Sequence, residues 1–182
     1  MPKLSGIRIA AGQHSGVPCT TENYGRRQPR SEAFLRFPYR WYGAGACFLL
    51  AGIFFICISN NPYIKKKVSS LRYVDGDVFD VLAAARDMVH KGFVLLADPL
   101  YGNFKPNQQP YRTIVLRSPQ SPGEVDIFSL DLVENALGIY RDSHVTAQRG
   151  TRGCDIDRDF RMIDFALIEE TLRTYSLLSA HK

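Results

Sequence analysis

The run Ala44-Gly-Ala-Cys-Phe-Leu-Leu-Ala-Gly-Ile-Phe-Phe-Ile-Cys-Ile58 decides which fold this chain can adopt, and it has two interpretations. Arginines precede the run, so residues 44–58 could form a helix that anchors the chain in the inner membrane. The run is shorter, however, than the roughly 20 apolar residues that such a helix needs. β-Branched and aromatic residues crowd into its last third, and Asn60-Asn61-Pro62 ends it. This pattern favours a buried strand over about residues 53–59.

The residues after this run alternate between helical and strand patterns. Asn61 can cap a helix, and Pro62 suits the first helical position. Asp77 caps the clearest helix, whose apolar residues recur on one face until Gly92 ends it. The pattern predicts strands over about 71–74, 93–96 and 112–116, and helices over about 63–69, 78–91, 129–142 and 156–178.

This order of elements predicts an α/β fold, with a small, mostly parallel sheet of about four strands flanked by helices. The last helix is expected to bury an apolar stripe. Its members are Phe160, Ile163, Leu167, Ile168, Leu172 and Tyr175. Its charged residues are expected on the solvated surface near its start: Asp157, Arg158, Asp159, Arg161 and Asp164.

Charge divides the chain into two parts. Residues 1–50 hold seven basic and two acidic side chains, whereas the other 132 residues hold sixteen of each. We interpret residues 1–50 as an irregular basic extension, either a disordered tail or residues added by a misassigned start, and residues 51–182 as a single α/β domain. The neutral domain lacks the concentrated basic footprint of nucleic-acid binding.

The cysteines and histidines indicate no metal or catalytic centre. The four cysteines have no ligand-type spacing, and the four histidines are scattered singly, so we predict no metal site. Neither GxxxxGK[ST] nor GxGxxG occurs, and the sequence therefore names no cofactor. A reducing, cytoplasmic compartment fits this cysteine usage best.

A candidate site lies where the predicted strands end. Ligands of open α/β sheets bind beyond the carboxyl ends of the strands, and the loop over residues 97–111 follows one of them. Three prolines and a glycine in this loop forbid regular structure, and loops of its length are usually functional or disordered. The ligand-binding candidates are Asn60, Asn61, Asp75, Asp98, Tyr101, Lys105, Asn107 and Tyr111. Helix capping explains Asn61 equally well, and solvation explains Lys105.

Several segments, in this order along the chain, resemble the GrdX family. They are Phe55-Ile-Cys-Ile-Ser-Asn-Asn-Pro62, Val74-Asp-Gly76, His90-Lys-Gly92, Asp98-Pro-Leu-Tyr-Gly102, Lys105-Pro-Asn107, Pro110-Tyr111 and Asp159-Phe-Arg-Met-Ile-Asp164. GrdX is a small protein encoded with the glycine, sarcosine and betaine reductase systems of amino-acid-fermenting anaerobes. The resemblance begins near residue 53. It implies a cytoplasmic accessory role with reductase components as partners, and it assigns no residue a catalytic task.

Three functions remain open at this point. The first is a non-catalytic accessory protein of such a reductase system that binds a small anionic or amino-acid-derived ligand. The second is a small enzyme that uses Asp98, with Lys105 or a tyrosine, on an amino-acid-derived or phosphorylated substrate. The third is a protein anchored to the membrane through residues 44–58.

Overall fold

The computed structural model describes residues 52–105, 108–121, 123–143, 149–150 and 153–179, so the expectation for residues 1–50 lies outside the described part. The elements in chain order are β1 (Phe55–Ser59), the 3-10 helix η1 (Pro62–Ile64), β2 (Leu71–Tyr73), α1 (Val78–Val89), β3 (Val94–Leu95), β4 (Thr113–Arg117), α2 (Ile127–Asp142) and α3 (Cys154–Thr174).

The apolar run that ends at Ile58 finishes as a strand. Residues 55–58 lie in β1, which pairs with both β2 and β4, so the strand prediction is confirmed. A membrane helix over residues 44–58 is therefore wrong, because its last four residues belong to the sheet; residues 44–51 lie outside the described part. In the described ranges, no helix has the length and apolar character needed to cross a membrane.

The sheet has the strand order β2-β1-β4-β3 and is mixed. β1 and β2 are parallel, whereas β4 is antiparallel to both of its neighbours. The prediction of a mostly parallel sheet is wrong because a parallel neighbour needs a long crossover, usually a helix. β4 instead follows β3 through a loop that reverses the chain. β1, β2 and β3 all run in one direction, so their carboxyl ends share an edge of the sheet with the amino end of β4.

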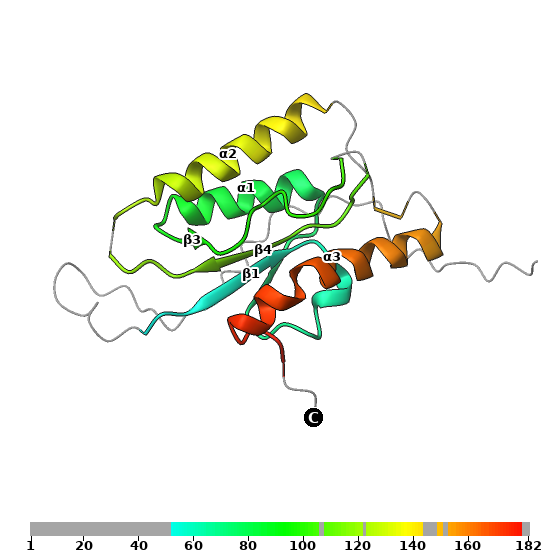
Figure 1. The fold of residues 1–182 in the computed structure, drawn as a ribbon, viewed down its shortest axis with the longest axis horizontal. Helices are drawn as coiled ribbons and strands as arrows, with labels where there is room; N and C mark the ends of the chain where they lie inside the picture. Colours follow the sequence, from blue (N-terminus) through cyan, green and yellow to red (C-terminus); the bar gives the residue numbers. More distant parts are fainter. Residues whose placement is uncertain (1–51, 106–107, 122, 144–148, 151–152, 180–182) are drawn as a thin grey trace, which may run out of the picture. The chain divides into compact units, whose positions relative to one another are not determined.

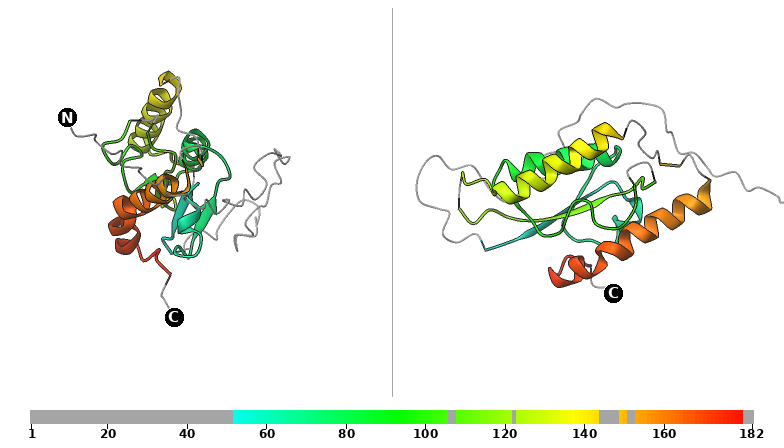
Figure 2. Two further views of the ribbon diagram at one scale, coloured as in Figure 1. Left: turned by 90° about the vertical axis from the view of Figure 1, so that its right-hand side faces the viewer. Right: turned by 45° about the horizontal axis from the view of Figure 1, so that its top comes forward.

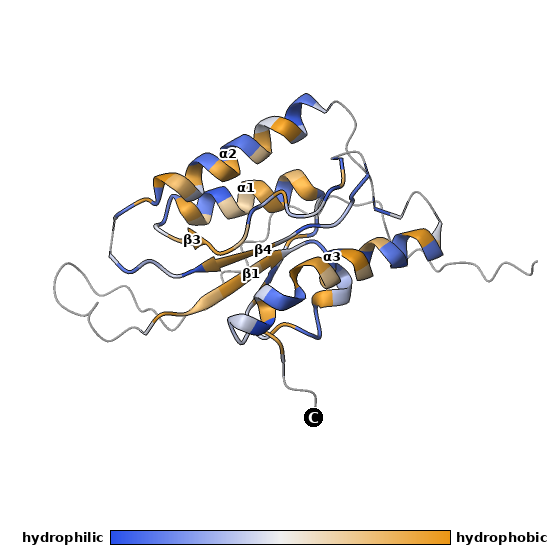
Figure 3. Ribbon diagram, viewed as in Figure 1, coloured by the Kyte–Doolittle hydropathy of each residue, from blue (hydrophilic) through white to orange (hydrophobic). Residues whose placement is uncertain are grey.

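The sheet separates two cores, with α1 and α2 on one face and α3 on the other (Figure 1). Ile56 and Ile58 of β1 pair with Leu116 and Ile114 of β4, and all four pack in the core beneath α1 and α2. The alternate side chains, including Cys57, pack with η1 and α3. Figure 2 shows the same two layers from other directions, and Figure 3 shows hydrophobic residues along β1 and β4. Both faces of the central strands are therefore covered, which explains their continuous apolar sequence.

The ends of α1 match the predicted signals. Asp77 accepts a hydrogen bond from the Asp80 backbone N–H, and the Asp80 side chain accepts one from the Asp77 N–H, which forms a capping box. Gly92 follows the helix with a φ of +87°. A Cβ there would lie 2.8 Å from the Glu124 carbonyl oxygen. Only glycine meets both conditions without strain.

The helix predicted over residues 63–69 is limited to the three residues of η1. The backbone of residues 68–69, in the last part of the predicted helix, instead pairs with residues 177–178. Val68 forms an antiparallel bridge with Leu178, and the Ser69 N–H donates to the Leu177 carbonyl oxygen at 2.9 Å. Pairing between distant segments therefore replaces the local helix.

Leu82 tests the core beneath α1. Leu82 is fully buried, so we expect Leu82→Ala to lower the free energy of unfolding by about 2–5 kcal/mol through lost burial and a cavity. Ile127, at the start of α2, is 71% exposed, and Ile127→Ala should change it by less than about 0.5 kcal/mol. Urea unfolding measures both values. Equal losses in the two variants would contradict the assigned core.

Candidate functional site at the carboxyl edge of the sheet

Asn60 joins the chain segments that meet at this edge. The residue directly follows β1 and is fully buried. Its Nδ2 donates to the carbonyl oxygens of Gly76 and Pro110 at 3.2 and 3.0 Å, and its Oδ1 accepts from the Arg112 N–H at 2.8 Å. One amide thus binds the turn after β2 to the segment that leads into β4. These bonds occupy both ends of the side-chain amide.

Asn61 connects the same edge to α3. Its Oδ1 accepts from the Tyr63 N–H at 2.9 Å and caps η1. Its Nδ2 donates to the Arg161 carbonyl oxygen at 2.8 Å and to Asp164 Oδ2 at 2.9 Å. The capping interpretation of Asn61 is confirmed, and the other end of the amide has a second role in holding α3.

Asp164 of α3 is the acceptor on which several elements converge. Its carboxylate is fully buried and accepts hydrogen bonds from the Tyr101 hydroxyl at 2.6 Å, Asn61 Nδ2 at 2.9 Å and Thr113 Oγ1 at 2.8 Å. Burial raises the pKa of Asp164 because the charged form is desolvated, although these three donors oppose the shift. Burial and the nearby Asp164 charge also raise the pKa of Tyr101, which keeps its hydroxyl a donor.

A relay of hydroxyl groups leads from β1 to this carboxylate. The Asn61 N–H donates to Ser59 Oγ at 2.9 Å, and Ser59 Oγ lies 2.8 Å from Thr113 Oγ1. Because Thr113 donates its proton to Asp164, the Ser59 hydroxyl must donate to Thr113. Every polar group in this relay therefore has a partner, as buried groups require.

A second buried carboxylate, Asp157, lies one turn into α3. The Tyr111 hydroxyl lies 2.8 and 2.9 Å from its two oxygens, and the Gly150 N–H donates to Oδ1 at 2.9 Å. Arg161 forms an ion pair with Asp157 and donates from Nε to the Tyr111 hydroxyl at 3.1 Å. Burial raises the pKa of Tyr111. This group fastens the loop before β4 to the start of α3.

The structure thus gathers four of the predicted site residues into one network, in which Tyr101 is half-buried and the others are buried: Asn60, Asn61, Tyr101 and Tyr111. Asp75 lies outside the buried part. Its carboxylate is 82% exposed and forms an ion pair with Arg149 at 3.0 Å. Arg149 also donates to the Asn60 carbonyl oxygen at 3.3 Å. Asp75 is therefore joined to the edge from the solvent side.

Two other predicted residues, Asp98 and Lys105, lie in the exposed part of the loop. Asp98 Oδ1 accepts from the Leu100 N–H at 2.7 Å, so the side chain shapes a turn. Lys105 is exposed, and Asn107 lies outside the described residues. The hydroxyl of Tyr101 donates to Asp164 and not to Asp98. The structure therefore does not join Asp98 and Tyr101 as an acid–base pair.

The sequence interpretation missed Asp157, Asp164 and Arg112. The expectation that Asp157 and Asp164 lie on the surface is wrong, because they are 4% and 0% exposed. Leu167, expected in the buried stripe, is 44% exposed. The observed stripe of α3 has the helical spacing i, i+4, i+7, i+11 and i+15 and runs from polar to apolar: Asp157, Arg161, Asp164, Ile168 and Leu172. This spacing can be seen in the sequence and places both aspartates on the face of Ile168 and Leu172, but their burial depends on partners from distant segments.

Arg112 completes the network with a buried positive charge. Its guanidinium carbon lies 4.5 Å from the centre of the Tyr101 ring, and Tyr101 in turn donates to Asp164. The charge of Arg112 and that of Asp164 are thus linked through one aromatic side chain. The arrangement can hold a charged group in a fixed position. Its two aspartates are engaged by donors of the chain itself.

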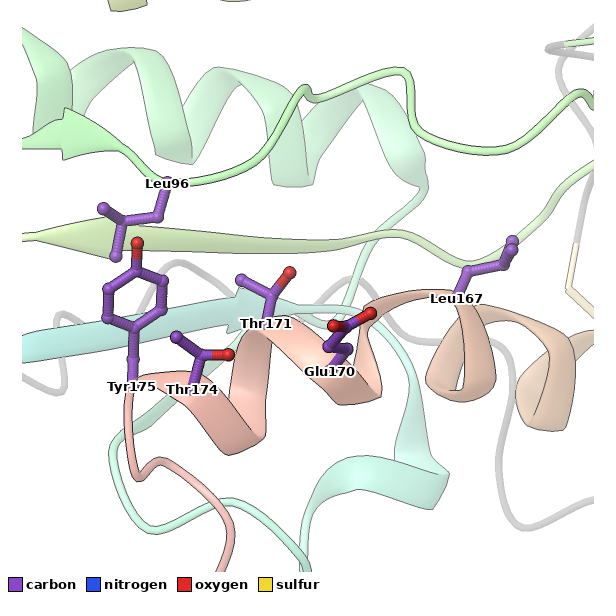
Figure 4. A pocket seen from close by; sticks show the side chains of 6 residues that line it. All are labelled: Leu96, Leu167, Glu170, Thr171, Thr174 and Tyr175. Atoms are coloured by element: carbon purple, nitrogen blue, oxygen red, sulfur yellow. The ribbon is translucent and has the colours of Figure 1, made fainter.

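A shallow groove of about 290 Å³ lies along α3 and contains none of these residues (Figure 4). Its lining includes one carboxylate and three hydroxyl groups: Leu96, Leu167, Glu170, Thr171, Thr174 and Tyr175. No group of three His, Cys, Asp or Glu side chains in the described ranges is placed to hold a metal ion. The candidate site therefore remains the polar network at the sheet edge.

Asp164→Asn tests the electrostatics of the network through pH. The raised pKa means that the folded state favours the protonated carboxyl more than the unfolded state does. The contribution of Asp164 to stability therefore falls as pH rises from about 3.9, the unfolded value, through the folded value. The stability of wild type minus that of Asp164→Asn should fall over this window, by up to about 1.4 kcal/mol per pH unit. Urea unfolding across pH measures it. A flat or rising difference for Asp164→Asn would contradict the assignment.

Tyr101→Phe tests the hydroxyl at the centre of the network. Its removal takes a donor from Asp164 and an acceptor from the Thr113 N–H, which bonds this hydroxyl at 3.0 Å. We expect a loss of about 1–3 kcal/mol in the free energy of unfolding. Tyr63→Phe, at a ring that is 37% exposed, should change it by less than about 0.5 kcal/mol. Losses of the same size in both variants would show that the hydroxyl has no special role.

Comparison with known proteins gives one match. The model of the family described as GrdX-like protein matches residues 56–173, from β1 to the last turn of α3. Searches of curated proteins and of solved structures found no match to the chain. The matched range includes every described residue of the polar network. The chain therefore belongs to the GrdX-like protein family, as the sequence resemblance indicated.

Proposed function

We propose that this protein is a non-catalytic accessory protein of a glycine, sarcosine or betaine reductase system, that it binds a small ligand, and that it works in the cytoplasm. Family membership supports the association with a reductase system. The ligand is an anion or a molecule derived from an amino acid. Reductase components are the proposed partners, and the neutral charge of residues 51–182 gives no support to a nucleic-acid partner.

The non-catalytic part of this proposal depends on the buried carboxylates, which are already hydrogen-bonded to donors of the chain itself. A general base must come within hydrogen-bond reach of a substrate proton. Asp164 accepts from three side chains, and Asp157 accepts from Tyr111, Gly150 and Arg161. These contacts serve to hold the chain segments together. The enzyme hypothesis invokes the exposed Asp98, but this side chain accepts a hydrogen bond from the Leu100 N–H within its own turn.

Capture from living cells tests the reductase association. The tagged full chain is expressed in an anaerobe that ferments glycine, cross-linked in the cells and purified, and the recovered proteins are quantified by mass spectrometry. We expect enrichment of reductase components because an accessory protein must meet the assembly that it serves.

The tagged Leu82→Ala variant is the matched control, since it changes only the stability of the fold. Its recovery of reductase components should fall with its folded fraction. Absence of every reductase component from the wild-type sample, in cells shown to be reducing glycine, would overturn the association. Equal recovery with an unrelated tagged protein would overturn it as well.

A further inference from the structure

Arg112 is a buried cation whose acceptors are all neutral. The residue is 1% exposed. Nη1 donates to the Tyr101 carbonyl oxygen at 2.7 Å, and Nη2 donates to Gln109 Oε1 at 2.7 Å and to the Tyr140 hydroxyl at 3.4 Å. No carboxylate of the described residues forms an ion pair with it. Burial of a charge without a direct counter-ion is costly. The negative charge of Asp164 acts on Arg112 across the Tyr101 side chain, so the guanidinium has no anion in direct contact.

Two donors in this place have no acceptor. They are Arg112 Nε and Gln109 Nε2, both closed off from solvent, and Gln109 is 1% exposed. The bond between Arg112 Nη2 and Gln109 Oε1 makes the two side chains direct neighbours. Buried donors are nearly always paired in proteins, with an acceptor of the chain, a water molecule or an ion. The two side chains therefore provide positive charge and free N–H groups together.

The surrounding network holds the guanidinium in place before any ligand arrives. Asn60 Oδ1 accepts from the Arg112 backbone N–H, and the Tyr101 ring lies against the guanidinium while its hydroxyl is fixed by Asp164. Arg112 also stands directly before β4, at the edge that holds the carboxyl ends of the other strands. A cation held rigidly at this edge suits ligand binding, because little side-chain freedom is lost when the ligand binds.

We propose that Arg112 and Gln109 bind the carboxylate of a small molecule, with its oxygens accepting from Arg112 Nε and Gln109 Nε2. A carboxylate has one oxygen for each of these two donors and brings a negative charge into direct contact with Arg112. The covering side chains must move for the ligand to enter, because both donors are buried. This inference rests on the proposed function, because it names the class of ligand that the accessory protein binds.

Thermal unfolding of the full chain with defined probes tests the site. A ligand that binds only the folded state raises the apparent Tm. Sodium formate, sodium acetate and glycine should raise the Tm to a plateau at constant ionic strength. Sodium chloride and glycinamide, which lack the carboxylate, should not. Equal Tm values with formate and chloride, or equal shifts with glycine and glycinamide, would overturn the proposal and leave a buried water as the partner of these donors.

Gln109→Glu separates ligand binding from general stabilisation. The new carboxylate keeps the acceptor for Arg112 Nη2 and replaces the unpaired amide nitrogen with a tethered anion. We expect this variant to have a higher Tm without ligand. Its apparent affinity for formate should be about tenfold weaker than that of wild type, because the Arg112 charge is already paired. The decisive result is the loss of the Tm increase with formate. A higher Tm without ligand would also follow from pairing a buried cation and is not decisive by itself.

Gln108→Glu is the matched control, as it adds the same charge one residue earlier. Gln108 is exposed, and its Oε1 accepts from the Lys105 N–H at 3.1 Å, a bond that glutamate can keep. This variant should respond to formate like wild type. A formate response of Gln109→Glu equal to that of wild type would overturn the site. Failure to capture reductase components would leave the formate response unaffected, so the two proposals fail separately.

Discussion

The buried carboxylate of Asp164 is the constraint on which this structure depends. A desolvated charge is tolerated only when donors surround it, and here the donors come from Asn61 in the turn after β1, the loop after β3 and the first residue of β4. Each donor belongs to a different chain segment. The requirement to satisfy one charge therefore fixes the relative positions of α3, the long loop and the sheet edge.

The two halves of α3 are held by different forces. Ile168 and Leu172, in its carboxyl-terminal half, pack with Cys57 and Val115 in an apolar core. Asp157 and Asp164, nearer its start, are held by directional hydrogen bonds to side chains and backbone. Apolar packing tolerates small shifts, whereas hydrogen bonds set positions closely. The polar half of α3 thus gives the sheet edge a defined geometry that an apolar helix would not supply.

The groups that stabilise the sheet edge differ from those of the proposed carboxylate site. Asp157 and Asp164 have all the donors that they need, and they serve to hold the loop over residues 97–111 against the sheet. Arg112 and Gln109 retain unused donors in the same environment. These two side chains are the ones that we propose to bind a carboxylate. The GrdX-like family match spans the residues that build this site.

The sequence alone determined most of the elements, although not the extent of the helix expected over residues 63–69. Capping residues, apolar periodicity and β-branched runs act over a few residues, so they predicted β1 and α1 with Asp77 as its cap. The order of the segments that resemble GrdX indicated the family. Only the tertiary structure decided the direction of β4 and the burial of Asp157 and Asp164, because both depend on contacts between distant segments. An aspartate on an amphipathic helix is read as exposed unless its partners are known. Those partners, Tyr101, Tyr111 and Asn61, lie 46 or more residues away along the chain, and folding alone brings them together.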